Sequence, residues 1–271
     1  MSAQALAHAT ATLAAAGCET PRLDAEVLLA EAVEVDRLTL LARNGTALSA
    51  AQHGRFDALI ARRARREPVA YILGRRGFRD LELAVDSRVL VPRPETELLV
   101  EAALELPRGA RVLDIGTGSG AVALALKHER PDLEVAGSDV SAHALVVARA
   151  NGERLGLDVA WHRADLVNGA AGPWDAVVAN PPYVAEDELS TLAPEIHHEP
   201  RAALEAGEDG LEVISRLVPE LSEAGVPWVA LEVGLGQAAA VREGLAGAGY
   251  ARIEARDDLA GIPRVVVARR T

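Results

Sequence analysis

The stretch RVLDIGTGSGAVALALKHE, residues 111–129, does most to constrain how this 271-residue chain can fold. An apolar run typical of a strand enters a loop with three glycines, and an apolar helical pattern follows. Strand and helix patterns continue to alternate as far as a helix expected to begin near Gln237, which predicts a parallel sheet with right-handed crossovers. The last two strand patterns, ARIEARDD and RVVVARR, are too close for a helical crossover and are expected to pair antiparallel.

Before this α/β region, up to about residue 75, apolar residues recur at helical spacing. Thr20 followed by Pro21 is typical of a helix start, and a further helix is expected to begin after Ser49. The alanine-rich N-terminus lacks the basic region of a signal peptide. We therefore expect a small helical domain over residues 1–75.

Between the two regions, the stretch GFRDLELAVDSRVLV alternates apolar and polar residues, which is typical of a β-hairpin. Asp86 and Ser87 are the expected turn residues. The predicted organisation is a helical domain over residues 1–75, a hairpin linker over residues 76–92, and an α/β domain over residues 93–271.

The glycine loop indicates a nucleoside site. Gly116, Gly118 and Gly120 lie between the first strand and its helix, where the missing Cβ atoms let backbone amides approach a ligand. Asp139 ends the second strand, where a carboxylate can accept hydrogen bonds from ribose hydroxyls. With Ala121 the loop also satisfies the dinucleotide pattern GxGxxA, so the loop alone leaves S-adenosylmethionine, a dinucleotide and a structural turn open.

A second motif, Asn180-Pro181-Pro182-Tyr183, follows the apolar run VVA. The two prolines end the strand with a stiff, extended backbone. If the Asn180 side-chain oxygen and the Pro181 carbonyl accept the two N–H groups of a planar nitrogen, its lone pair is directed at a methyl donor. Tyr183 offers an aromatic face to the planar group. Such a site suits nucleobase amino groups and protein glutamine equally.

Composition narrows these alternatives. A net charge of −12 and an aromatic content of 3% argue against stable nucleic-acid binding, because that affinity comes largely from neutralised phosphates. Cys18 is the only cysteine and the histidines lack metal-ligand spacing, so no metal site is expected. No segment has the roughly 20 consecutive apolar residues of a membrane span, and we expect a soluble, cytoplasmic protein. Seven arginines crowd one segment, either as a solvated face or as a contact for an acidic substrate: Arg62, Arg63, Arg65, Arg66, Arg75, Arg76 and Arg79.

VLDIGTGSGAVALAL, with Asp139 and NPPY downstream, resembles the class I S-adenosylmethionine-dependent methyltransferases, a Rossmann-like α/β fold. The resemblance implies a seven-stranded sheet whose last strand is antiparallel and inserted beside the fifth. It also implies that Asp165, in RADL, meets the adenine edge, with Leu166 beside the ring.

The combination of EPVAYILGRRGF, PRPETE, NPPY and HEPRAALEAGEDGLEVISRL resembles the HemK/PrmC family, the N5-glutamine methyltransferases of class I peptide chain release factors. The implied substrate is the glutamine of a Gly-Gly-Gln motif, held by Asn180, Pro181, Pro182 and Tyr183. The residues implied to hold S-adenosylmethionine are Gly116, Thr117, Gly118, Ser119, Gly120, Asp139, Asp165, Leu166 and Asn180.

Three competing interpretations remain at this point. A nucleic-acid adenine or guanine amino methyltransferase would flip a base into the Asn180 pocket, and it predicts a basic stripe around the cleft. An NAD(P)-dependent oxidoreductase would leave NPPY without a role. An inactive adaptor would have no need of an intact Asn180 and glycine loop.

Overall fold

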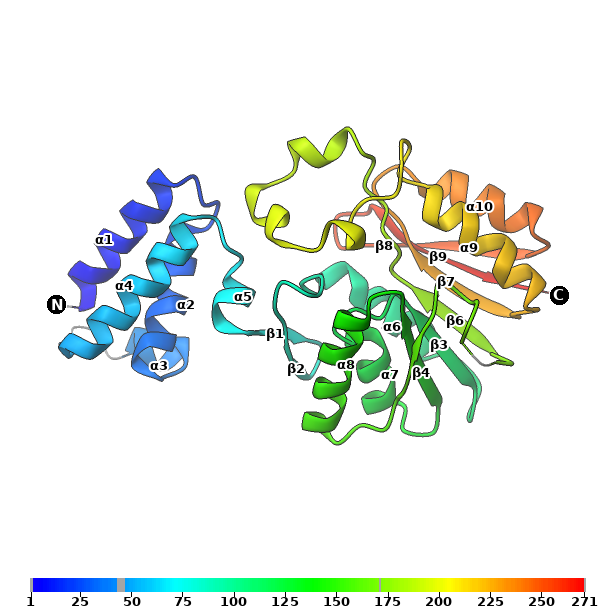
Figure 1. The fold of residues 1–271 in the computed structure, drawn as a ribbon, viewed down its shortest axis with the longest axis horizontal. Helices are drawn as coiled ribbons and strands as arrows, with labels where there is room; N and C mark the ends of the chain where they lie inside the picture. Colours follow the sequence, from blue (N-terminus) through cyan, green and yellow to red (C-terminus); the bar gives the residue numbers. More distant parts are fainter. Residues whose placement is uncertain (1, 43–46, 171, 271) are drawn as a thin grey trace. The chain divides into compact units, whose positions relative to one another are not determined.

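The structure is a computed structural model that describes residues 2–42, 47–170 and 172–270. The chain divides into two compact units (Figure 1). The smaller comprises residues 1–75 together with 193–198, and the larger comprises residues 76–192 and 199–271. The short segment 193–198 thus belongs to the helical unit although it lies far from residues 1–75 in the sequence.

The smaller unit is helical, as predicted. The helix after Thr20 begins at Pro21, but the Thr20 hydroxyl donates to Asp24 Oδ1 at 2.8 Å instead of capping the helix. Ser49 does cap its helix, in a capping box with Gln52. The helices bury one core that includes Leu13, Leu28, Leu29, Phe56 and Ile60. They are α1 (Ser2–Ala15), α2 (Pro21–Val33), α3 (Arg37–Ala42), α4 (Ala50–Ala64), α5 (Val69–Leu73) and the 3-10 helix η3 (Pro194–His198).

Arginines of the crowded segment make structural ion pairs within this unit. Arg63 is only 5% exposed, and its guanidinium contacts Asp24 at 2.7 Å and Glu195 at 2.8 Å. Arg66 forms a two-pronged pair with Glu195 at 2.6 and 2.8 Å. Burial raises the pKa of Glu195, but these hydrogen bonds outweigh it and bring the pKa down to about 2. The expectation of a solvated arginine face was wrong for these two residues, because α4 and the turn after it direct them at acids of α2 and η3.

The predicted hairpin is present, but its turn is not where the sequence suggested. The strands are β1 (Arg75–Phe78) and β2 (Leu81–Ala84), so the turn lies at Arg79 and Asp80, with Arg79 at φ 47°. The expectation of a turn at Asp86 and Ser87 was wrong for this hairpin. The side-chain amide of Asn151 pairs with the backbone N–H and C=O of Ala84, at 2.7 and 3.0 Å, which satisfies the backbone where strand pairing stops.

The larger unit contains a seven-stranded sheet in the order β5-β4-β3-β6-β7-β9-β8. β9 runs antiparallel between β7 and β8, and the other neighbouring pairs are parallel. This confirms the expected antiparallel closing pair and the inserted last strand. The strands are β3 (Arg111–Ile115), β4 (Glu134–Asp139), β5 (Ala160–Arg163), β6 (Ala176–Ala179), β7 (Trp228–Glu232), β8 (Arg252–Asp257) and β9 (Pro263–Arg269).

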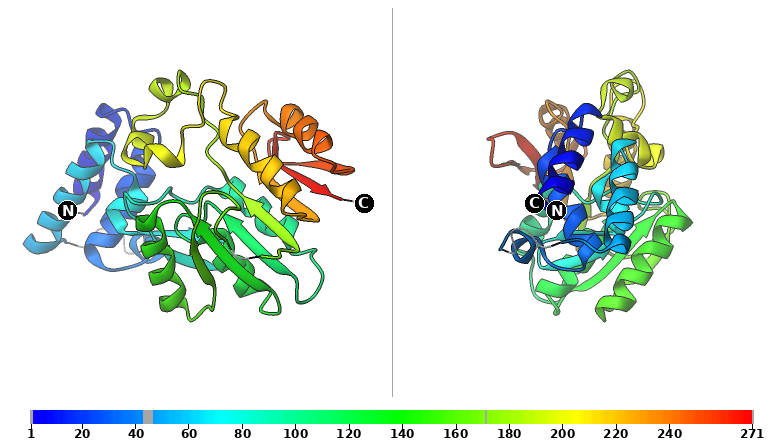
Figure 2. Two further views of the ribbon diagram at one scale, coloured as in Figure 1. Left: turned by 45° about the vertical axis from the view of Figure 1, so that its right-hand side comes forward. Right: turned by 90° about the vertical axis from the view of Figure 1, so that its left-hand side faces the viewer.

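Helices cover both faces of the sheet (Figures 1 and 2). Because neighbouring strand residues point to opposite faces, Val112 packs with α6 and α7, while Leu113 packs with α9 and α10. The central strands are buried on both sides, as expected for a parallel sheet. The helices are α6 (Glu97–Ala103), α7 (Ala121–Glu129), α8 (Ala142–Leu155), α9 (Glu212–Glu223) and α10 (Ala238–Gly247), with short 3-10 helices η1 (Pro94–Thr96), η2 (Glu188–Thr191) and η4 (Arg201–Ala203). None of the helices in the described ranges is long and apolar enough to cross a membrane.

Candidate active site

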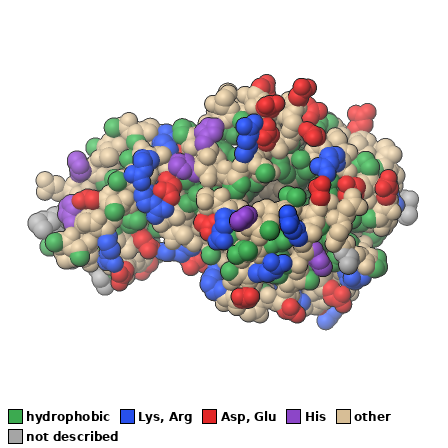
Figure 3. All heavy atoms as spheres, viewed as in Figure 1, with side chains coloured by type: hydrophobic (Ala, Val, Ile, Leu, Met, Phe, Trp, Pro, Cys, Tyr) green, Lys and Arg blue, Asp and Glu red, His purple; other side chains and the backbone are tan. Residues whose placement is uncertain are grey.

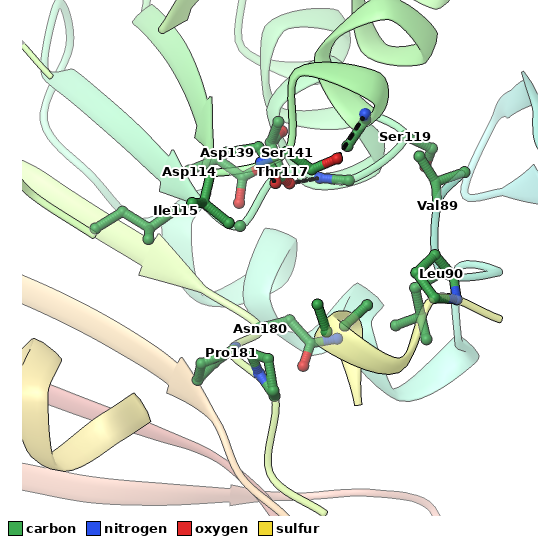
Figure 4. Close-up of a pocket in the computed structure, with 18 of the residues that line it drawn as sticks. Val89, Leu90, Asp114, Ile115, Thr117, Ser119, Asp139, Ser141, Asn180 and Pro181 are labelled. Carbon is green, nitrogen blue, oxygen red and sulfur yellow. Dashed lines mark hydrogen bonds between the residues drawn. The ribbon is translucent and has the colours of Figure 1, made fainter. Parts of the chain in front are cut away.

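A cavity of about 440 Å³ opens at the carboxyl ends of β3, β4 and β6, where parallel sheets of this kind bind ligands. Figure 4 shows Asp114, Asp139 and Ser141 on one side of it, Asn180 and Pro181 on another, and Val89 and Leu90 on a third. All of its lining residues belong to the larger unit.

The glycine loop turns tightly from β3 into α7. Gly120 has φ 84°, and a Cβ there would lie 2.9 Å from Leu124 and 3.0 Å from Trp161, so only glycine fits. Asp114, at the end of β3, supports the loop from beneath: its Oδ2 accepts from the Thr117 hydroxyl at 2.6 Å and from the Ala123 N–H at 3.2 Å. Burial raises the pKa of Asp114 to about 7.

Asp139 ends β4 with its carboxylate already oriented. Oδ2 accepts from the Gly118 N–H at 3.0 Å, and Oδ1 accepts from the Ser141 N–H at 2.8 Å. Burial raises the pKa of Asp139, and these two backbone donors partly offset the effect. Each oxygen keeps a lone pair for a further donor, which suits a ribose diol.

Asp165 and Leu166 also line the cavity. Leu166 is buried in a left-handed conformation at φ 56°. Asp165 is more than half exposed and forms an ion pair with Arg216 of α9, with Oδ2 and Nη2 2.7 Å apart. The structure therefore places Asp165 at the cavity, paired with an arginine that the sequence did not indicate, and its contact with adenine stays a prediction.

Asn180 follows β6, and its side chain is held from one side. Its Nδ2 donates to the Thr96 hydroxyl oxygen at 3.2 Å, so the amide oxygen is the part left for a ligand. Asn180, Pro181 and Pro182 line the same cavity as Asp139. Asn180 and Pro181 thus lie across the cavity from Asp139 (Figure 4).

Tyr183 is not among the described residues that line this cavity. A Cβ on Gly234 would lie 3.2 Å from its ring, and its carbonyl accepts from Gln237 Nε2 at 2.9 Å. Burial, followed by the negative charge of Glu232, raises its pKa to about 12. The aromatic-face role of Tyr183 stays a prediction.

A buried glutamate connects two sequence motifs that line the same side of the cavity. Glu199, in HEPR, accepts from the Val91 N–H at 3.1 Å and from Arg93 at 2.6 Å. Its side chain is 2% exposed. Pro92 and Pro200, beside these groups, both line the cavity. The VPRP and HEPR stretches are therefore joined by hydrogen bonds at the edge of the cavity.

Residues 4–74 match the PrmC N-terminal domain family, and residues 94–220 match the methyltransferase small domain family. A release factor glutamine methyltransferase of Deinococcus radiodurans is 42% identical over 270 residues, which cover 98% of this chain and 97% of that protein. One of Neisseria gonorrhoeae is 41% identical, over 92% of this chain and 93% of that protein. The chain belongs to the release factor glutamine methyltransferase family.

Membership of the release factor glutamine methyltransferase family confirms the predicted fold class and the prediction of an S-adenosylmethionine-dependent methyltransferase. Among solved structures, a methyltransferase of Pyrococcus furiosus is similar with a TM-score of 0.53 and 18% identity, covering 70% of this chain and 88% of that one. The hMettl16 catalytic domain in complex with the MAT2A 3'UTR hairpin 6 is similar with a TM-score of 0.59 and 17% identity, covering 78% of this chain and 81% of that one. At these identities the two structures show the shared fold alone.

The residues present fit the family's cofactor. The cavity offers a preorganised carboxylate for a ribose at Asp139, an apolar contact at Leu166, and a second carboxyl group, Asp114, whose negative charge would suit a sulfonium or an ammonium group. The glycine loop supplies close backbone between them.

Sequence reasoning missed several residues of this family site. Glu199 and Thr96 gave a weak signal because their partners are far away in the chain: Glu199 contacts residues more than 100 positions earlier, and Thr96 reaches Asn180 across 84 positions. Asp114 was missed although its hydrogen bonds are local, to Thr117 and Ala123. Placing PRPETE and HEPR beside NPPY in space could have suggested them. The residues missed are Thr96, Asp114, Glu199, Arg216 and Glu232.

Proposed function

We propose that this chain transfers a methyl group from S-adenosylmethionine to the side-chain amide nitrogen, N5, of the glutamine in the Gly-Gly-Gln motif of class I peptide chain release factors. Its relatives of about 40% identity carry the name of that activity. The proposal rests on the orientation of the Asn180 side chain. Its amide nitrogen donates to Thr96, so its amide oxygen is available to a ligand in the cavity.

A glutamine amide nitrogen is a weak nucleophile because its lone pair is delocalised into the carbonyl group. In the proposed mechanism the Asn180 oxygen accepts one N–H and the Pro181 carbonyl accepts the other, so that the nitrogen lone pair is aimed at the methyl group. The bound cofactor supplies an electrophilic methyl group on a sulfonium. As the new N–C bond forms, the methyl–sulfur bond would break and leave its electron pair on sulfur. The nitrogen becomes strongly acidic and releases one proton to solvent, so no base needs to act first.

The other site residues predicted from the sequence have the following roles in this proposal. Asp139 binds the ribose hydroxyls, Asp165 and Leu166 contact the adenine, and the loop from Gly116 through Thr117, Gly118 and Ser119 to Gly120 approaches the rest of the molecule. Pro182 stiffens the backbone after β6, and Tyr183 offers its aromatic face to the planar amide of the substrate. The helical domain binds the folded release factor. The enzyme acts in the cytoplasm.

A protein substrate is favoured over nucleic acid by the charges around the cavity. Two arginines line it, and each is paired with an acid: Arg216 with Asp165, and Arg88 with Asp86 at 2.6 Å. On the face drawn in Figure 3, basic and acidic side chains are interspersed, and hydrophobic side chains surround the hollow. A phosphate backbone needs unpaired cations, so stable nucleic-acid binding is not part of the proposal.

The test offers intact release factor, its Gln→Glu and Gln→Asn variants, and unmethylated DNA and RNA in parallel with labelled cofactor. We expect one methyl group on the wild-type glutamine, none on glutamate, which has no N–H donors, and little on asparagine, which is one methylene shorter. Replacing Asn180 with Ala should lower kcat by about 100-fold or more, with a much smaller effect on cofactor affinity. Label in nucleic acid but not in release factor would favour the amino methyltransferase alternative instead.

A further inference from the structure

Thr96 sits between the catalytic amide and a buried carboxyl group. It ends η1 in the PRPETE motif and is 5% exposed. On one side its hydroxyl oxygen accepts from Asn180 Nδ2 at 3.2 Å, and on the other side it faces the buried carboxyl group of Glu232, on whose pKa it acts. Glu232 is the last residue of β7 and is 2% exposed. Its Oε2 is buried without a hydrogen-bond partner in the described structure.

The direction of these bonds follows from counting hydrogens. A threonine hydroxyl carries one hydrogen and can give it to one acceptor. When Glu232 takes that hydrogen, the Thr96 oxygen can only accept, so the group facing it must be a donor. Asn180 meets this condition only with its NH₂ toward Thr96 and its oxygen toward the cavity.

We propose that Thr96 and Glu232 are positioning residues that hold the Asn180 amide oxygen toward the substrate nitrogen. This role rests on the function proposed above, since it matters only if Asn180 accepts a hydrogen bond from the glutamine. Without the carboxylate, Thr96 could donate to the Asn180 oxygen instead, and the amide could turn its NH₂ to the substrate. Two N–H donors would then face each other, and the productive complex would be lost.

The protonation state of Glu232 controls the same arrangement. Burial raises the pKa of Glu232 to about 7, and the hydrogen bond from Thr96 partly offsets this. Protonated Glu232 can donate to Thr96, which frees the threonine hydrogen for the Asn180 oxygen. Methyl transfer should therefore weaken as the pH falls below about 7. The other charged or titratable groups acting on Glu232 or on the neighbouring Tyr183 are Glu95, Arg93 and Arg264.

The experiment compares Thr96→Val, which keeps the shape but removes the hydroxyl, with Thr96→Ser, which keeps the hydroxyl. We expect Thr96→Val to lower kcat about tenfold or more while the cofactor Kd changes less than twofold, and Thr96→Ser to retain most of the wild-type kcat. Release factor carrying Gln→Glu should inhibit Thr96→Val more strongly than wild type, because a turned Asn180 offers N–H donors to the carboxylate. A variant that is merely less well packed would not show this gain.

Glu232→Gln gives an independent readout, because its amide can donate or accept and does not titrate. Wild-type kcat should fall as the pH is lowered through about 7, while the kcat of Glu232→Gln should be reduced and should lack this step. Other titrating groups, Asp114 included, are common to both proteins and cancel in the comparison. If Thr96→Val does not fold, the pH profiles of wild type and Glu232→Gln alone test the positioning role.

Identical pH profiles for wild type and Glu232→Gln, or a wild-type kcat in folded Thr96→Val, would overturn the positioning role while leaving the proposed function intact. If the wild-type enzyme puts no methyl group on release factor glutamine, the proposed function fails first, and the positioning role falls with it.

Discussion

Replacing Asp114 with Asn should stabilise the cofactor-free protein at neutral and alkaline pH. Both hydrogen bonds that Asp114 accepts, from Thr117 and Ala123, go to the same oxygen, so an asparagine carbonyl can accept both. The other carboxyl oxygen, which accepts no hydrogen bond from the described residues, is replaced by NH₂ at the wall of the cavity. The substitution therefore removes a buried charge without removing the bonds that hold the glycine loop.

The size of the effect follows from the pKa of Asp114. Burial raises it from 3.8 to about 7, and the negative charge of Asp139 adds to the shift. A group whose pKa is raised in the folded state binds protons more tightly there, so the stability it confers is lost as the pH rises from about 4 to about 7. A shift of about 3 units corresponds to a cost of at most about 4 kcal/mol above pH 7. We expect Asp114→Asn to recover about 1–4 kcal/mol at pH 8 and almost nothing at pH 4.

Urea unfolding at pH 4, 6 and 8 measures this difference. Tryptophan fluorescence reports the larger unit alone, because all three tryptophans of the chain lie in it: Trp161, Trp174 and Trp228. Asp158→Asn, at an exposed position, controls for the loss of one negative charge. A difference between Asp114→Asn and wild type that stays constant with pH, or that favours wild type at pH 8, would refute the reasoning.

Three further outcomes are expected. Asp139→Ala should weaken S-adenosylmethionine binding by roughly 1.5–3 kcal/mol in titration calorimetry, because charge-assisted hydrogen bonds are lost; unchanged affinity would remove this carboxylate from the site. Glu195→Gln should destabilise the helical unit by about 2 kcal/mol at pH 7. Because the pKa of Glu195 is depressed to about 2, the difference in stability between wild type and variant, measured by circular dichroism, should disappear as the pH falls from about 4.5 toward 2. Gly210→Ala should cost about 1–3 kcal/mol of stability and reduce methyl transfer, because φ is 72° and the new Cβ would lie 2.6 Å from the Tyr183 carbonyl oxygen. The control Gly244→Ala lies in open space on α10 and should have neither effect. Equal behaviour of the two variants would contradict this prediction.

The sequence by itself determined the features that depend on neighbours along the chain. The alternation around residues 111–129 specified a parallel α/β sheet, and the short connection before RVVVARR required an antiparallel last strand. The glycines and the residue type at the end of each strand indicated where Gly120, Asp139 and Asn180 would meet, because the carboxyl ends of parallel strands share one edge of the sheet. The place of Asn180 and Pro181 at this edge could therefore be predicted from the sequence, and their role as acceptors stays a prediction.

Only the tertiary structure decided which side chains are buried and what they contact. Nothing in the sequence indicated that Arg63 is buried, whereas in the structure α4 places it against Asp24 and Glu195. Glu232 gave no signal in the sequence, and only the fold places its buried carboxyl group beside Thr96, which contacts Asn180. Burial raises the cost of an unpaired charge and fixes the direction of a hydrogen bond, and both depend on atoms brought together from distant parts of the chain. Local patterns carry no record of those neighbours, so most of the residues that line the cavity could be predicted, while the distant groups that contact them could not.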